Sequence, residues 1–132
     1  MSGSQQLILA EGAGGAAPVY IEDVFSTWLY TGTGSARSIS SGIDLSTYGG
    51  LVWVKDRTQS STFNVLVDTA RGASRPIYSN SNLPQQNASS QNINGFNSNG
   101  FSLGTDLFGN VNTNGDNFAS WTFRKQPKYL LS

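Results

Sequence analysis

Between Val19 and Arg124 the chain is broken into short runs of β-branched and aromatic residues, separated by clusters of Gly, Asn, Ser and Asp. Such runs favour strands, and such clusters favour turns. About seven or eight short strands with a turn signal roughly every 8–12 residues are typical of an antiparallel sandwich or jelly roll. No segment has the periodicity of an amphipathic helix that could connect parallel strands. We therefore expect an all-β fold, an antiparallel β-sandwich or jelly roll.

The pattern of the last strand predicts which side chains share a face. Residues 118–124 alternate, with Ala119, Trp121 and Phe123 on one face and Ser120, Thr122 and Arg124 on the other. The run 51–56 is apolar on both faces at its start and indicates a buried strand. Large aromatic side chains in strand patterns usually pack in a core. We expect this of all three tryptophans, Trp28, Trp53 and Trp121, and the alternative is that they stack on sugar rings.

The chain is expected to have an N-terminal arm and one domain. Residues 1–18 include a Gly- and Ala-rich stretch that cannot pack a core, and they predict a flexible N-terminal arm. Residues 19–132 predict the β-sandwich, which ends there or continues into further polypeptide. Within it, residues 79–99 are almost purely Ser, Asn, Gln and Gly, and they indicate a long surface loop or a loop that is ordered only by its neighbours.

Both ends of the sequence carry large apolar side chains. Leu7, Ile8 and Leu9 lie in the arm, and Tyr129, Leu130 and Leu131 follow the last strand. Three adjacent large apolar residues on a free end would be exposed to water, so we expect both groups to bind a partner. The alternatives are a frayed N-terminus and a C-terminal run that leads into more polypeptide.

The chain lacks the residue types on which most catalysis depends. It has no histidine and no cysteine, and only 12% of its residues are charged. This excludes most transition-metal sites, cysteine nucleophiles and near-neutral acid–base pairs. The carboxylates sit beside turn residues, where capping explains them better than a hydrolase pair would. The Asp- and Asn-rich segment 106–117 has oxygen ligands that could suit a calcium site, but their spacing matches no recognised calcium-binding loop. We expect no enzyme activity, no catalytic or metal-binding residue and no cofactor.

Charge and hydropathy limit the partners. Eight basic and eight acidic residues give a formal net charge of zero, which offers no basic face for nucleic acid. A chain near zero net charge is also weakly protected against self-association. No segment approaches the roughly 20 apolar residues of a membrane span, and no export signal is recognisable. We expect synthesis in the cytoplasm and a role in an assembly.

One loop is expected to be structural, and four aromatic residues are candidates for ligand contact. In 68–72, Asp68 can bind nearby amides, Arg71 can reach back to that carboxylate, and Gly72 permits a positive φ. A carbohydrate-binding module would need an exposed aromatic platform beside amide groups. The candidates for such a platform are Tyr20, Tyr48, Tyr78 and Phe108.

Five blocks follow one another over residues 19–129. They are VYIEDVFS with YTGTG (19–34), GIDL with GGLVWVKDR (42–57), DTARG (68–72), FNSNGFSLG (96–104) and FASWTFRK (118–125). This series resembles a β-sandwich module found near the start of virion proteins of tailed phages, especially tail fibres and tail-tip proteins of marine phages. The resemblance implies a lectin-like, concanavalin-type sandwich without catalytic residues.

The resemblance also implies a function and an assembly. We expect a structural protein of the phage virion, located in the tail and made in the bacterial host, as the particle-attached N-terminal part of a tail fibre. Its partners would be copies of itself, with a homotrimer favoured, and other tail or virion proteins. The alternatives are a lectin-like module that binds a host-surface glycan, and a capsid decoration or head-fibre protein.

Overall fold

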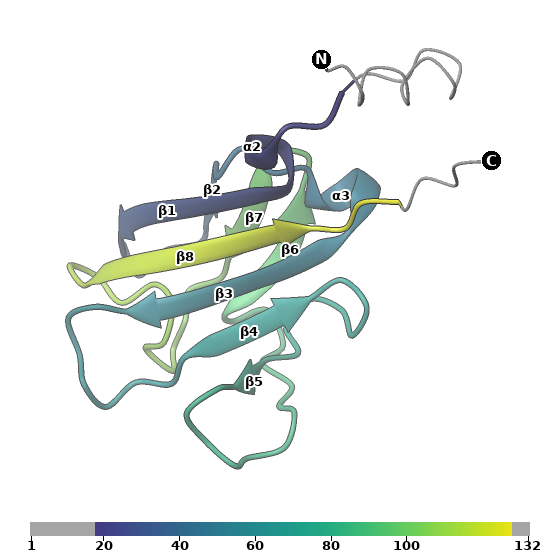
Figure 1. Cartoon of the computed structure of the whole chain (residues 1–132). Coiled ribbons are helices and arrows are strands. Elements are labelled where there is room, and N and C mark those ends of the chain that lie inside the picture. Colours follow the sequence, from purple (N-terminus) through teal and green to yellow (C-terminus); the bar gives the residue numbers. More distant parts are fainter. Residues whose placement is uncertain (1–17, 128–132) are drawn as a thin grey trace.

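The computed structural model describes residues 18–127, and these form two antiparallel sheets (Figure 1). The larger sheet has five strands in the order β1-β8-β3-β4-β5, and the smaller has three in the order β2-β7-β6. Buried side chains from both sheets form one hydrophobic cluster between them. The expected all-β antiparallel sandwich is therefore confirmed.

The five-stranded sheet is built around the longest strand, β8 (Asn117–Arg124). On one side β8 pairs with β1 (Phe25–Thr31), and on the other with β3 (Gly50–Asp56). On its other side β3 pairs antiparallel with β4 (Val65–Asp68). β4 pairs in turn with the short β5 (Ile77–Tyr78), which forms the far edge of the sheet. Residues rich in Val, Leu and aromatic side chains explain why these segments are extended.

The three-stranded sheet contains a strand that the sequence did not reveal. β2 (Arg37–Ile39) and β6 (Ile93–Asn97) pair with the two sides of β7 (Gly100–Leu103). β6 lies within the segment 79–99, so the expectation of a surface loop over all of that segment is wrong. Only Ile93 of β6 is fully buried, and the register shifts between Ile93 and Gly95. A strand with one buried anchor and a bulge gives little alternation for sequence analysis to detect.

Two single-turn helices flank the sandwich. α2 (Ile21–Val24) immediately precedes β1, and α3 (Leu45–Tyr48) immediately precedes β3. Asp44 caps α3, because its Oδ1 accepts a hydrogen bond from the backbone N of Thr47 at 2.9 Å. That bond lowers the pKa of Asp44 below its ordinary value.

The core is made of aliphatic residues and phenyl rings. Phe101 and Phe118 are its largest fully buried side chains. The ring of Phe118 stacks on Tyr30 with centroids 5.3 Å apart, and the Tyr30 hydroxyl donates to the carbonyl of Val111 at 2.8 Å. A buried tyrosine that keeps a partner for its hydroxyl avoids the cost of an unpaired polar group.

The expectation that the three tryptophans pack in the core is wrong, since none belongs to the buried cluster. In β8 the side chains of Phe118, Ser120 and Thr122 are buried, so these alternate positions face inward. Thr122 pairs with Val52 of β3, and Ser120 pairs with Val54. The valines are fully buried and fill this space, so small side chains fit beside them where an indole ring would not.

Candidate functional site

The inward orientation of Phe118, Ser120 and Thr122 turns the aromatic side of β8 away from the core. Ala119, Trp121 and Phe123 therefore face outward, as do the residues paired with them on β1 and β3. We call the apolar side chains on this side of the five-stranded sheet the outer face. Its members are Phe25, Leu29, Leu51, Trp53, Leu66, Ile77, Trp121 and Phe123.

The pairing register arranges the outer face in rows. One row runs across five strands, from Thr27 through Trp121, Trp53 and Leu66 to Ile77. Trp53 and Trp121 are half-buried, with ring centroids 5.4 Å apart. A neighbouring row places Phe25 against Phe123, with ring centroids 5.0 Å apart. The centre of the outer face is thus a continuous aromatic surface.

No described element covers this surface. In Figure 1 the strands β1, β8, β3 and β4 lie in front, β6 and β7 lie behind them, and no helix or strand of residues 18–127 crosses in front. Leu29 keeps 59% of its surface exposed, and Phe123 keeps 40%. A one-sided antiparallel sheet usually presents polar side chains to water, so an apolar outer face indicates a contact surface.

The outer face is hollowed at the end where α2 joins β1. A shallow cleft of about 630 Å³ lies between Tyr20 and Ile21 of the α2 region and the Phe25–Phe123 pair. Ile21 and Tyr20 are both exposed. Tyr48 lies near this end, but the guanidinium of Arg124 covers its ring at 3.9 Å from the centroid. Tyr20 and Tyr48 therefore do not form one platform with Tyr78 and Phe108.

Tyr78 and Phe108, by contrast, line the same pocket. Its volume is about 370 Å³, and Phe63 and Asn110 line it with them. The rings of Phe63 and Tyr78 stack with centroids 4.2 Å apart. We call this hollow the loop pocket, because most of its lining belongs to segments between strands.

The loop after β4 is tied together by its own side chains. Asp68 accepts hydrogen bonds at 2.8 Å from both the backbone N and the Nε of Arg71, and Gly72 adopts a φ of 105°. The guanidinium also donates to the carbonyls of Arg75 at 2.6 Å and Leu66 at 3.1 Å. Partial burial disfavours the charged carboxylate, but the bonds from Arg71 outweigh it and hold the pKa of Asp68 below its ordinary value.

Other carboxylates organise loops in the same way. They accept from backbone amides: Asp44 from Thr47, Asp56 from Thr58 and Gln59, and Asp106 from Val111 and Asn112. Within residues 18–127, no three acidic side chains gather into a group that could hold a metal ion. In the Asp- and Asn-rich segment 106–117, one oxygen of Asp106 holds a turn by accepting from the amides of Val111 and Asn112.

The apolar groups at the two ends of the sequence cannot be placed. Leu7, Ile8 and Leu9 lie outside the described residues, as do Tyr129, Leu130 and Leu131.

The surface that sequence analysis missed is the outer face. Its signal was present in β3, where Leu51, Val52, Trp53 and Val54 are apolar on both faces. A strand of that kind has an apolar neighbour on each side, and only one of them is the core.

Comparison with known proteins gives one match. A family model described as a domain of unknown function (DUF7483) matches residues 21–128. No curated protein and no solved structure matches the chain. Within the part that the structure describes, no helix is long and apolar enough to cross a membrane.

Proposed function

The chain belongs to this family of unknown function, DUF7483, and we propose that it is a non-catalytic structural protein of a tailed-phage virion. In this proposal it forms the particle-attached N-terminal part of a tail fibre. Its sandwich assembles with copies of itself, and residues 1–18 tether the assembly to another virion protein. The tail location and the trimer follow from the resemblance of the five sequence blocks.

The observation that carries the proposal is the uncovered outer face. Phe25, Trp53, Trp121 and Phe123 give it four aromatic rings, and a fully buried ring accounts for roughly 150–250 Å² of surface. Apolar area removed from water contributes roughly 25 cal/mol per Å². A contact that covers this face is therefore favoured, because an isolated sandwich leaves Phe123 exposed and the other three rings only partly buried.

A second copy of the chain is the occupant we propose for the outer face. The formal net charge is zero, so no overall repulsion opposes self-association. Soluble homo-oligomers close through point-group symmetry. Three outer faces arranged around a threefold axis would bury one another, which is how the homotrimer would form.

The use made of the carboxylates supports a structural role. Asp56 and Asp106 hold loops through backbone amides at 2.7–3.1 Å, and Asp68 holds Arg71. A general acid or base needs a proton-transfer position facing a substrate. Here both oxygens of Asp68 and one oxygen each of Asp56 and Asp106 hold turns, which suits a rigid scaffold.

The mass of the purified protein in solution tests the self-association. We expect a species of three times the 14.1 kDa chain mass in sedimentation velocity at micromolar concentration. The double variant Leu29→Lys/Phe123→Lys should shift it to monomer, because both side chains are exposed on the outer face. Leu107→Lys, at an even more exposed position outside this face, is the control. A wild-type chain that stays monomeric would overturn the self-association.

The virion location needs a separate experiment. An antibody raised against the purified domain should label tail fibres of intact particles in immunogold electron microscopy. Labelling confined to the capsid would contradict the tail-fibre proposal and support the alternative of a capsid decoration or head-fibre protein. Absence of the chain from purified virions would refute the virion proposal altogether.

A further inference from the structure

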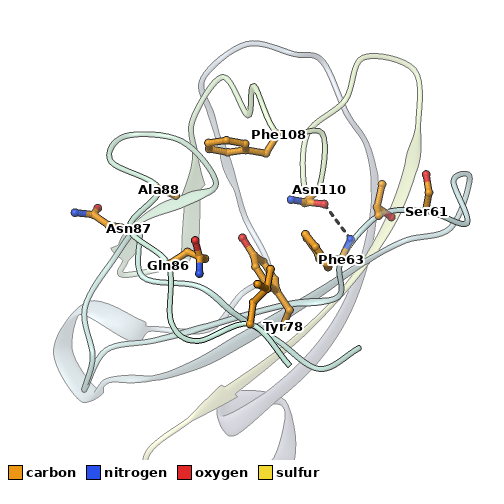
Figure 2. A pocket seen from close by; sticks show the side chains of 10 residues that line it. Ser61, Phe63, Tyr78, Gln86, Asn87, Ala88, Phe108 and Asn110 are labelled. Carbon is orange, nitrogen blue, oxygen red and sulfur yellow. Dashed lines mark hydrogen bonds between the residues drawn. The ribbon is translucent and has the colours of Figure 1, made fainter. Parts of the chain in front are cut away.

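The loop pocket combines aromatic surfaces with polar groups that have no protein partner. Figure 2 shows Phe108 on one side of the hollow, the Phe63 and Tyr78 side chains on the other, and Asn110 between them. Its volume of about 370 Å³ lies in the range typical of small-molecule sites, roughly 300–1,000 Å³.

Two aromatic surfaces border the pocket. The stacked pair of Phe63 and Tyr78 has an interplanar angle of 18°. Phe108 remains 64% exposed although it is a large apolar side chain. An exposed ring beside a hollow provides a flat apolar surface on which the C–H face of a ligand ring can pack.

Asn110 provides a donor that the fold itself leaves free. Its side chain is only 4% exposed, and its Oδ1 accepts from the backbone N of Phe63 at 3.0 Å. Its Nδ2 makes no hydrogen bond to any residue of 18–127, and in Figure 2 this nitrogen lies on the Phe108 side, away from the Phe63 bond. This nitrogen is open to the solvent in the pocket, so it can donate to water or to a ligand oxygen there.

Two further polar groups are available at the pocket. The Tyr78 hydroxyl forms no hydrogen bond with the described residues. Gln86 donates from Nε2 to the carbonyl of Pro84 at 2.7 Å, which leaves its Oε1 as an acceptor. The pocket thus offers donors and an acceptor next to apolar rings.

The charge of the lining narrows the ligand class. No residue of the pocket lining carries a formal charge. Burial raises the pKa of Tyr78, and the nearby carboxylate of Asp106 raises it further. A site without cations, and with a carboxylate close by, disfavours phosphate, sulfate and carboxylate groups.

We propose that the loop pocket binds a neutral pyranose ring of a glycan, with Phe108 packed on an apolar face of the sugar and Asn110 Nδ2 donating to one of its oxygens. A neutral sugar combines hydroxyl groups with an apolar C–H face, and the lining presents matching groups for both. The inference is independent of the assembly proposed above, because the outer face and the loop pocket share no residue.

Saturation-transfer difference NMR with neutral hexoses and N-acetylhexosamines as probes tests this. A single ring should bind with a dissociation constant on the order of 1 mM, from the affinity per atom typical of small ligands. Phe108→Ala should weaken binding about tenfold, because it removes one aromatic wall. Tyr78→Phe keeps the stacked ring and removes only the hydroxyl, and should weaken binding by about threefold to tenfold.

Leu107→Ala is the matched control, since Leu107 is 83% exposed, adjacent to Phe108 and absent from the pocket lining. It should bind the sugars like the wild type. Phe108 and Leu107 lie outside the core cluster, and Tyr78→Phe keeps the ring that packs against it. Circular dichroism verifies that all three variants are folded. The proposal is overturned if no neutral sugar binds at 10 mM probe, a level about tenfold above the expected constant. It is also overturned if only acidic sugars or peptides bind, or if Phe108→Ala binds as well as the wild type.

Discussion

Trp53 and Trp121 face each other across β3 and β8 with ring centroids 5.4 Å apart, on the side of the sheet opposite the core. The pair stands in the middle of a row that extends from β1 to β5. Aromatic pairs of this kind contribute about 0.5–1.5 kcal/mol beyond the area they bury. Its position means that the largest side chains of β3 and β8 lie at a surface and not in the interior.

The core and the outer face should respond differently to the same substitution. Phe101→Ala removes a fully buried ring, and we expect the free energy of unfolding to fall by about 3–5 kcal/mol. Phe123→Ala removes an outer-face ring that is 40% exposed, and should cost about 1 kcal/mol in the monomer. Urea unfolding followed by tryptophan fluorescence measures both. Equal losses would mean that the outer face is part of the folding core.

Asn112 should be the most sensitive amide of the chain. Its side chain accepts from the backbone N of Thr33 at 3.0 Å and donates to the carbonyls of Ser35 at 2.8 Å and Gly104 at 3.0 Å. Asn112→Ala removes three hydrogen bonds of a fully buried side chain and should cost about 3 kcal/mol. Asn114→Ala, two positions away and exposed, should change stability by less than about 0.5 kcal/mol. Thermal unfolding by circular dichroism would reveal a similar loss in both variants if the bonds did not matter.

The Asp68–Arg71 pair should make stability depend on acid pH. The pKa of Asp68 is lower in the folded chain than in the unfolded one, whose ordinary value is about 3.9. Its contribution is therefore present above that pH and is lost as the pH falls through the folded pKa. Asp68→Asn should be less stable than the wild type at pH 6, and the two should converge near pH 2. Urea midpoints measured across this range check it, and a difference that stays constant with pH would contradict it.

Deletion of residues 1–18 should separate folding from attachment. Both sheets and the core cluster are built from residues 25–124, so the truncated chain should keep its unfolding temperature within a few degrees, as expected for a change of under about 1 kcal/mol. If the arm is a tether, the same truncation should abolish incorporation into virions, scored by mass spectrometry of purified particles. Normal incorporation of the truncated chain would refute the tether.

Local chemistry explains what sequence analysis predicted well. The Asp68–Arg71–Gly72 loop depends on groups within five residues of one another, and the clusters of Gly and Asn mark where strands end. β6 was missed because only Ile93 is buried in it, so its five residues show no alternation. Its partner β7 supplies the hydrogen bonds that keep it extended, and such pairing is invisible in a single segment.

The loop pocket shows the same limit. Tyr78 and Phe108 were candidates among four aromatic residues, but Asn110 and Phe63 gave no sign that they belong to one hollow. They meet because the loops that follow β3, β5 and β7 converge in space. Their separation along the chain leaves no short-range pattern that could have joined them.

The sequence by itself determined an antiparallel all-β fold, because strand and turn preferences act within a few residues. Alternation in 118–124 also determined that the two sides of β8 differ. Only the tertiary structure decided which side meets the second sheet. That choice depends on the space left by Val52 and Val54 on the neighbouring strand β3, which Ser120 and Thr122 fit and an indole ring does not. The aromatic side was left facing outward for this reason.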